Sequence, residues 1–286
     1  DVLRAAFAQQ RDRYDIVHAQ DCISANAALP CIRTIHHLDH FTTPQLAACH
    51  EKAVIDPYAR ICVSQSVADE VAAGWGYAPT VIPNGVDAAR FAAGAGDAAG
   101  REAWRERLGR YVLALGGIEP RKGSLDLLEA YAALRASDPS QAGLKLVFGG
   151  GETLFDYRDY RAAFDARARE LDVPVVITGV LEEDELPSLV AEAGALAMVS
   201  TKEGFGLAAL EALAAGVPVV ARDLPVLREV FGETVAYATT PAEISLALGK
   251  ILDTPPDPSA GRDLAAQYTW VRAARAHQIF YRRVRG

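Results

Sequence analysis

The sequence predicts an α/β protein in which parallel sheets are covered by helices on both faces. Short apolar runs recur along the chain, and helical stretches with an apolar face separate them. Strands that are apolar on both faces are typical of a parallel sheet buried between helices. The predicted strands are 14–18, 31–35, 59–63, 80–83, 111–115, 144–148, 174–178, 195–200 and 218–221.

The distribution of these runs indicates two doubly wound, Rossmann-like domains. Residues 92–100 are rich in Ala and Gly and carry no period, so we expect a linker over 92–105. Residues 106–268 hold enough strands for a complete domain, whereas 1–91 hold about four, roughly the back half of one. The chain starts at Asp1 and its one Met is Met198. We therefore expect an incomplete first domain.

The end of the chain predicts a helix over 270–283. It carries three aromatic side chains, Trp270, Phe280 and Tyr281, which are expected to pack against another element. We expect residues 269–286 to return to the first domain. The basic stretch 281–285 either complements the end of this helix or makes a weak membrane-surface contact.

Charge and composition exclude several classes of function. The net charge of −8 argues against a nucleic-acid-binding protein, which needs a basic surface. No apolar run is long enough to cross a bilayer and no signal-peptide pattern opens the chain, so we expect a cytoplasmic protein. The four Cys residues form no CxxC pair, which indicates reduced thiols and no zinc site.

The first motif that could carry chemistry is LGGIEPRKG at 115–123. It joins a predicted strand to a predicted helix, which is where ligands bind in open α/β sheets. Its glycines permit close backbone approach, and Arg121 and Lys122 suit a diphosphate. An exposed turn with two solvated cations is the alternative. The motif is neither GxxxxGK[ST] nor GxGxxG, which disfavours an NAD-binding protein.

The second motif is TKEGFGLAALE at 201–211. Gly204 and Gly206 precede a predicted helix over 206–215, whose first amides could bind an anion. Glu203 lies at the strand end, and carboxylates accept hydrogen bonds from sugar hydroxyls. The alternatives are a helix N-terminal charge for Glu203 and a solvated helix face for Glu211.

The histidines cluster at the start of the chain, with five of six in the first fifty residues. His36 and His40 have the i, i+4 spacing of a helical metal pair. The segment follows a strand, lacks an HExxH glutamate and offers no third ligand, so a metal site is disfavoured.

These motifs together resemble the family 4 retaining glycosyltransferases of the GT-B fold. The two glutamates within EGFGLAALE and the GGIEPRKG loop carry the resemblance most specifically. Further matches are DIVHAQ at 15–20, TIH at 34–36, VIPNGVD at 81–87 and ITGVL at 177–181. The resemblance covers nearly the whole chain and implies a nucleotide-sugar donor as substrate, with no cofactor and no metal.

The resemblance also implies roles for single residues. Arg121 and Lys122 would neutralise the donor diphosphate. Glu203 would bind hydroxyls of the transferred sugar, Glu211 would bind the ribose diol, and His36 would face the reacting sugar. The residues expected to approach the donor through their backbone are Gly117, Gly179, Val180, Gly204, Phe205, Gly206 and Leu207.

The expected activity is metal-independent sugar transfer with retention at the anomeric carbon. No Asp-x-Asp motif occurs, so cationic side chains and a helix dipole would take the place of a metal. The acceptor stays open among sugars, lipid-linked groups and small molecules. Two alternatives are a GT-B phosphorylase, which uses inorganic phosphate, and a sugar-nucleotide-binding module without catalysis.

Overall fold

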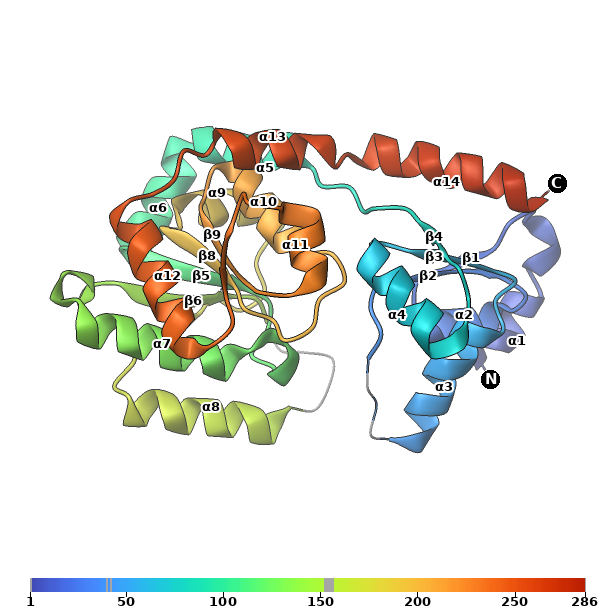
Figure 1. Ribbon diagram of the computed structural model, residues 1–286, viewed down its shortest axis with the longest axis horizontal. Helices are drawn as coiled ribbons and strands as arrows, with labels where there is room; N and C mark the ends of the chain where they lie inside the picture. The colour runs from blue at the N-terminus through green and yellow to red at the C-terminus, as the bar shows by residue number, and fades with distance from the viewer. Residues whose placement is uncertain (1, 40, 42, 152–156, 286) are drawn as a thin grey trace. The chain divides into compact units, whose positions relative to one another are not determined.

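The computed structural model describes residues 2–39, 41, 43–151 and 157–285 (Figure 1). They form two compact units. The first combines Asp1–Gly85 with Trp270–Gly286, and the second is Val86–Thr269. Both units are built on parallel sheets, as the apolar runs predict.

The first unit contains a four-stranded parallel sheet in the order β1-β2-β3-β4. Ile32 pairs with Ala59, and Ile61 pairs with both Thr34 and Thr80, so the register is continuous across the sheet. The strands are β1 (His18–Ala19), β2 (Ile32–Ile35), β3 (Ala59–Cys62) and β4 (Thr80–Val81). The helices are α1 (Val2–Ala8), α2 (Cys22–Ala28), α3 (Pro44–Ile55), α4 (Gln65–Trp75) and α14 (Trp270–Arg285), with a short 3-10 turn η1 at Arg11–Arg13.

Alternation along the strands decides which helix covers which face of this sheet. Ile35 and Cys62 pack with Val54 of α3 and Val67 of α4. Ile32 and Ile61 point to the opposite face, where they pack with Phe280 of α14. Phe280 and Tyr281 thus pack in the first unit as expected, whereas Trp270, at the start of the helix, is exposed.

The second unit contains a six-stranded parallel sheet in the order β10-β9-β8-β5-β6-β7. The strands are β5 (Tyr111–Leu115), β6 (Lys145–Gly149), β7 (Val175–Ile177), β8 (Ala195–Met198), β9 (Val219–Arg222) and β10 (Ala236–Ala238). The helices are α5 (Ala88–Gly96), α6 (Ala98–Leu108), α7 (Ser124–Ser137), α8 (Arg158–Glu170), α9 (Leu186–Glu192), α10 (Leu207–Ala215), α11 (Pro225–Phe231), α12 (Pro241–Asp253) and α13 (Ser259–Gln267), with 3-10 turns η2 (Pro120–Lys122) and η3 (Pro139–Gln141). Helices α7, α8 and α12 cover one face of the sheet, and α9 and α10 lie on the other (Figure 1).

The order of the strands reverses between β5 and β8. From β5 the chain proceeds outward through β6 and β7, then returns to place β8 on the other side of β5. In open parallel sheets, ligands bind beyond the carboxyl ends of the two strands that flank such a reversal. Both motifs identified in the sequence follow these two strands.

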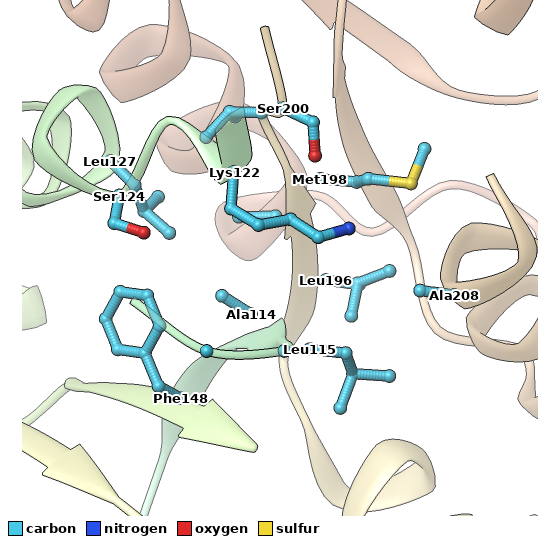
Figure 2. A pocket seen from close by; sticks show the side chains of 14 residues that line it. Ala114, Leu115, Lys122, Ser124, Leu127, Phe148, Leu196, Met198, Ser200 and Ala208 are labelled. Atoms are coloured by element: carbon cyan, nitrogen blue, oxygen red, sulfur yellow. The ribbon is translucent and has the colours of Figure 1, made fainter. Parts of the chain in front are cut away.

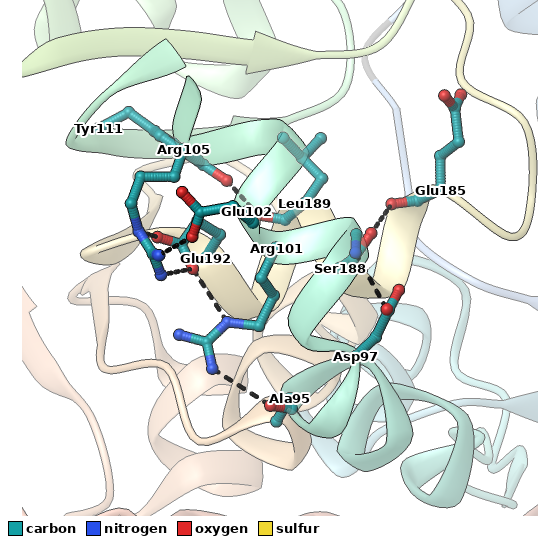
Figure 3. Close-up of polar contacts among 11 residues, drawn as sticks. Ala95, Asp97, Arg101, Glu102, Arg105, Tyr111, Glu185, Ser188, Leu189 and Glu192 are labelled. Atoms are coloured by element: carbon teal, nitrogen blue, oxygen red, sulfur yellow. Dashed lines mark hydrogen bonds and ion pairs between the residues drawn. The ribbon is translucent and has the colours of Figure 1, made fainter. Parts of the chain in front are cut away.

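The segment 92–105, expected to be an irregular linker, is helical and belongs to the second unit. Asp87 and Asp97 cap two consecutive helices, α5 and α6, by accepting hydrogen bonds from the amides of Arg90 and Gly100 at 3.0 Å. Alanine is the residue with the highest helix propensity, which outweighs the glycines here. Figure 3 shows how Arg101 and Arg105 of α6 both bind the carboxylate of Glu192 at the end of α9.

Each of the nine predicted strands overlaps a strand of the structure, and β10 is the one that the sequence did not reveal. It is a three-residue strand at the sheet edge, too short for a recognisable pattern. Within the residues that the structure describes, no helix combines the length and the apolar character needed to span a bilayer.

Candidate functional site at the carboxyl ends of β5 and β8

The first loop of the site follows β5. The residues Pro120–Lys122 form one 3-10 turn, and Gly123 then starts α7 with a positive φ of 65°. A Cβ at this position would lie 2.4 Å from the carbonyl oxygen of Val199, so only glycine fits between the loop and β8. This close approach places Arg121 and Lys122 beside the end of the neighbouring strand.

The second loop follows β8 and ends at Gly206, which precedes α10. Gly206 has φ +93°, and a Cβ there would lie 2.9 Å from the Phe231 ring and 3.0 Å from Met198. The first amides of a helix have no partner within the helix and carry partial positive charge. The loop thus presents the start of α10, at Leu207, to the crevice. Gly204 and Phe205 are buried behind it, with the Phe205 ring edge-on to Tyr268 at 5.3 Å.

Backbone and side-chain bonds hold the two loops together. The amide of Thr201 donates to the carbonyl of Arg121 at 2.8 Å. The Lys122 ammonium donates to Glu203 Oε1 at 2.8 Å, and the Arg121 guanidinium lies 3.8 Å from the same oxygen. Ser200 donates its hydroxyl proton to that oxygen at 2.8 Å. The Arg121 guanidinium also donates to Glu119 Oε1 at 3.3 Å. Two cations and two carboxylates therefore meet at the point where the strand order reverses.

Glu203 is held as a carboxylate by these neighbours. Its side chain is only 12% exposed, and burial alone would raise its pKa. Lys122, Ser200 and Arg121 oppose that effect and hold the pKa of Glu203 below its ordinary value. A buried, ionised carboxylate beside two cations can accept hydrogen bonds from hydroxyl groups, and the remaining ammonium protons of Lys122 can bind an anion.

A small pocket lies between the loops, and Figure 2 shows its lining. Gly116, Gly117 and Lys122 contribute from the β5 side, and Ser200 and Ala208 from the β8 side. The ammonium of Lys122 points across the pocket between the two sides. The structure thus brings together Gly117, Lys122 and the start of α10, which the sequence analysis assigned to one anion site.

Arg222 lies beneath the two loops and is almost fully buried. Its guanidinium donates to the carbonyls of Val199 at 2.9 Å and Thr239 at 2.5 Å, and to the Asp126 carboxylate at 2.5 Å. These contacts join the end of β8, the end of β10 and the first turn of α7. Arg222 therefore fixes the spacing of the loops without facing the pocket.

The loops after β6 and β7 extend the same edge of the sheet. A Cβ at Gly150 would lie 2.9 Å from the backbone of Gly116, and one at Gly151 would lie 2.8 Å from the Val180 side chain. Gly179 has φ +77°, and the Val180 side chain is 88% exposed. An exposed aliphatic side chain beside a glycine turn gives a planar ring a surface to lie against.

Two family models match the chain. Residues 101–263 match the model described as glycosyl transferases group 1, and residues 1–90 match the model described as glycosyltransferase family 4. The first match covers more than half of the chain and includes both loops of the site. This chain belongs to the group 1 glycosyltransferase family.

Curated relatives and solved structures agree with this assignment. The chain is 32% identical over 261 aligned residues to a D-inositol 3-phosphate glycosyltransferase from Salinispora arenicola; the match covers 77% of the chain and 56% of that relative. It is 30% identical over 300 aligned residues to a glycogen synthase from Mycobacterium tuberculosis, covering 94% of the chain and 69% of that relative. The structure resembles Anabaena HepE, crystallised with UDP and glucose, with a TM-score of 0.83 at 21% identity, covering 97% of the chain and 80% of that structure. The predicted GT-B fold is confirmed.

Glu211 of this group 1 glycosyltransferase lies one turn along α10 from Leu207. Burial raises its pKa to about 7, and Arg90 of α5 opposes this rise. The carboxyl group therefore changes its charge near neutral pH, unlike Glu203. Glu211 is not among the residues that line the pocket between the loops.

His36 lies in the first unit, directly after β2. Burial lowers its pKa to about 4, and electrostatic interactions with Arg33 and His37 add to this effect. Its ring Nε2 lies 2.9 Å from Oε1 of Gln20. The ring is therefore neutral at pH 7, with one nitrogen engaged by a side-chain amide.

Across the described part of the chain, no cluster of three or more His, Cys, Asp or Glu side chains could hold a metal ion. His40, one member of the pair weighed above, lies outside the described residues. His37 instead lies 3.0 Å from the carboxylate of Asp39.

Ser200 and Arg222 of this site are not among the residues predicted from the sequence, and neither is Gln20, the partner of His36 in the first unit. Ser200 and Arg222 stand at the ends of predicted apolar strands, and a polar residue at that edge of a parallel sheet is a usable signal. Gln20 directly follows β1 and carries the same signal, and its partner His36 lies sixteen residues further along the chain, directly after β2.

Proposed function

We propose that this chain transfers a sugar from a nucleotide-sugar donor to an acceptor, with retention at the anomeric carbon and without a metal ion. The observation that carries the proposal is the meeting of Lys122, Arg121 and Glu203 between β5 and β8. One site there offers cations for a diphosphate and a carboxylate for sugar hydroxyls. HepE, which shares the fold, is described with UDP and with glucose, so UDP-glucose is the first donor to test.

The diphosphate would take the positive groups of the site. The Lys122 ammonium has three donors, of which Glu203 uses one. The others, the Arg121 guanidinium and the first amides of α10 would bind phosphate oxygens. Negative charge grows on the departing diphosphate as the glycosidic bond breaks. Groups fixed in advance around that charge lower the barrier without reorganising.

The carboxylates would recognise hydroxyl groups. Glu203 is ionised and fixed by Lys122 and Ser200, so it can accept hydrogen bonds from the transferred sugar. Glu211 would accept from the ribose diol in its ionised form, and Gly179 and Val180 would contact the base. His36 would contact a hydroxyl of a bound reactant.

If cationic side chains and the start of α10 take the place of a metal ion, turnover should not depend on metal ions. Turnover of the donor should be unchanged when EDTA is present. A loss of activity in EDTA that Mg²⁺ or Mn²⁺ restores would overturn the metal-independent part of the proposal.

The donor site is tested by thermal unfolding with UDP, GDP, ADP and their sugar conjugates, without added metal. A ligand that binds only the folded state raises the midpoint by mass action. We expect one nucleotide to raise the midpoint, and Lys122→Ala to abolish that rise. If no nucleotide raises it, the donor site is wrongly assigned.

Product analysis separates transfer from the alternatives. If the donor carries an α-linked sugar and the product is also α-linked, the reaction retains the anomeric configuration. Breakdown of a disaccharide by inorganic phosphate, with release of a sugar phosphate, would establish a phosphorylase. Glu203→Ala should abolish transfer while the protein still unfolds cooperatively, and full activity in that variant would sink the assignment of Glu203.

A further inference from the structure

A chain of hydrogen bonds in the first unit joins the C-terminal helix to His36. The Tyr281 hydroxyl of α14 lies 2.7 Å from Nδ1 of His18. Nε2 of His18 lies 2.6 Å from the Thr34 hydroxyl and 3.3 Å from Nε2 of Gln20. Oε1 of Gln20 lies 2.9 Å from Nε2 of His36. The members come from β1, β2, the residues that follow each strand, and a helix about 260 positions later.

The side-chain amide of Gln20 determines which atoms of this hydrogen-bond network donate and which accept. An amide nitrogen only donates and an amide oxygen only accepts. Nε2 of His18 must therefore carry the lone pair, and Nε2 of His36 must carry the proton. The proton of His18 is then on Nδ1, where it is donated to Tyr281, while the Thr34 hydroxyl donates to Nε2. Nε2 of His18 thus accepts from two donors, the Thr34 hydroxyl at 2.6 Å and the Gln20 amide at 3.3 Å, and no contact pairs two donors or two acceptors.

Both imidazole rings are neutral, so the position of the proton is well defined. Burial lowers the pKa of His18 to about 4, and electrostatic interactions with His277, Arg33 and His36 add to this effect. The pKa of His36 is also lowered to about 4. At pH 7 each ring holds a single proton, and its tautomer is set by hydrogen bonds alone.

We propose that Tyr281, His18 and Gln20 are positioning residues that fix His36 in its Nε2-protonated tautomer, so that Nδ1 presents a lone pair to a hydroxyl group of a bound reactant. Nδ1 of His36 makes no hydrogen bond with any residue that the structure describes. The lone pair would accept the proton of a hydrogen bond from the sugar. The other tautomer would present an N–H, and could bind a hydroxyl only through its oxygen. The role of His36 toward the reactant rests on the proposed function, whereas its tautomer does not.

The tautomers are measured directly by NMR of the protein labelled with ¹⁵N-histidine at pH 7, with His36→Asn and His18→Asn identifying the two rings. We expect Nε2–H for His36 and Nδ1–H for His18. His277 is an internal reference, because its Nδ1 lies 2.8 Å from the carbonyl of Ala273 and must carry a proton. An Nδ1-protonated His36 in the wild-type protein would overturn the proposal.

The decisive variant is Tyr281→Phe, which removes one hydroxyl from α14. Without that acceptor His18 is expected to move its proton to Nε2, toward Thr34. The amide of Gln20 then turns its oxygen toward His18, and His36 shifts toward its Nδ1-protonated form. The matched control is Tyr14→Phe, an exposed tyrosine outside this network, which should leave both spectra unchanged. If the tautomer of His36 is the same in Tyr281→Phe as in the wild-type protein, the hydrogen-bond network does not set it and the proposal is wrong.

Steady-state turnover of UDP-glucose adds a kinetic readout. Gln20→Ala should lower kcat about tenfold, the loss expected from one misplaced hydrogen bond, with KM changed less than about twofold. Gln9→Ala, an exposed glutamine in the same unit, is the control. The expected tautomers without any turnover would reject the proposed function and leave the positioning network standing. Turnover with the opposite tautomer of His36, or with an unchanged kcat in Gln20→Ala, would reject the network alone.

Discussion

Lys122 Nζ and Glu203 Oε1 lie 2.8 Å apart, although 81 positions separate the two residues in the chain. The pair is possible because β5 and β8 are neighbours in the sheet. Each residue follows one of these strands, so the contact crosses the point where the strand order reverses. The candidate donor site is therefore a property of the sheet order, and its individual loops are incomplete without each other.

Removing the positive charge of Lys122 should weaken donor binding. Lys122→Met keeps the aliphatic stem and loses the ammonium, and we expect the Kd for UDP-glucose to rise about tenfold to hundredfold, as for one charge-assisted hydrogen bond. Isothermal titration calorimetry measures this. Lys250→Met, on the exposed side of α12, serves as the control, and an equal effect in both variants would contradict a specific role for Lys122.

The charge of Glu203 should appear in the pH dependence of stability. Its pKa is lowered in the folded state. The stabilisation that ionised Glu203 adds to the folded protein is therefore complete above the ordinary pKa of 4.5, and is lost as the pH falls through the folded-state pKa. Urea unfolding at pH 7 and pH 4 should show a smaller loss for Glu203→Gln than for the wild-type protein. An equal fall in unfolding free energy for both proteins would mean that its neighbours do not lower the pKa of Glu203.

Glu211 should act in the opposite sense. Its pKa is raised to about 7 by burial, so the folded state loses stability as the pH rises from about 4.5 to about 7. The unfolding free energy lost over this pH range is on the order of 3 kcal/mol. Glu211→Gln should remove this slope in unfolding experiments between pH 4.5 and pH 8.

The same titration should control donor affinity. If the ionised carboxylate accepts from the ribose diol, the affinity for UDP-glucose should increase between pH 6 and pH 8, because Glu211 loses its proton there. Calorimetry across this range should show the increase in the wild-type protein, and Glu211→Gln should bind weakly at every pH. A pH-independent wild-type affinity would argue against contact with the diol.

Gly206 should tolerate no side chain. Its φ of +93° and the contact with the Phe231 ring predict that Gly206→Ala displaces the start of α10, with a loss of about 1–3 kcal/mol in unfolding free energy and weaker donor binding. Gly143→Ala is the control, because a Cβ there meets no atom within 4 Å. The two variants should separate clearly in urea titrations.

Arg222 should stabilise the two loops from below. Arg222→Met leaves the Asp126 carboxylate, the buried carbonyl of Val199 and the carbonyl of Thr239 without their donor, and we expect the unfolding free energy to fall by about 3 kcal/mol. Arg228→Met breaks an exposed ion pair with Asp223 and should cost less than about 1 kcal/mol. Similar losses would remove Arg222 from the supporting structure of the site.

The sequence predicts the parallel sheets and both loops of the site because their signals are local. An apolar run followed by Gly117 or Glu203 is visible within ten residues. The Ala/Gly composition of 92–105 favours a linker, but the helix propensity of Ala and the Asp97 cap outweigh the glycines. The distant contact of Arg101 with Glu192, which the sequence does not reveal, adds to them. The contacts of Arg222 with Asp126 and of Gln20 with His36 are equally hidden, because the partners are 96 and 16 positions apart in the chain.

The reversal of strand order also determines when the donor site can exist during synthesis. The Lys122 loop leaves the ribosome first, and α7, β6, α8, β7 and α9 follow before β8 and Glu203 are made. For the 81 positions between Lys122 and Glu203, synthesis at 5–20 residues per second gives a delay on the order of ten seconds. Throughout that interval the nascent chain holds the cations of the site without their carboxylate, so the donor cannot assist the earlier folding steps and can stabilise only a chain whose sheet is already closed around β5.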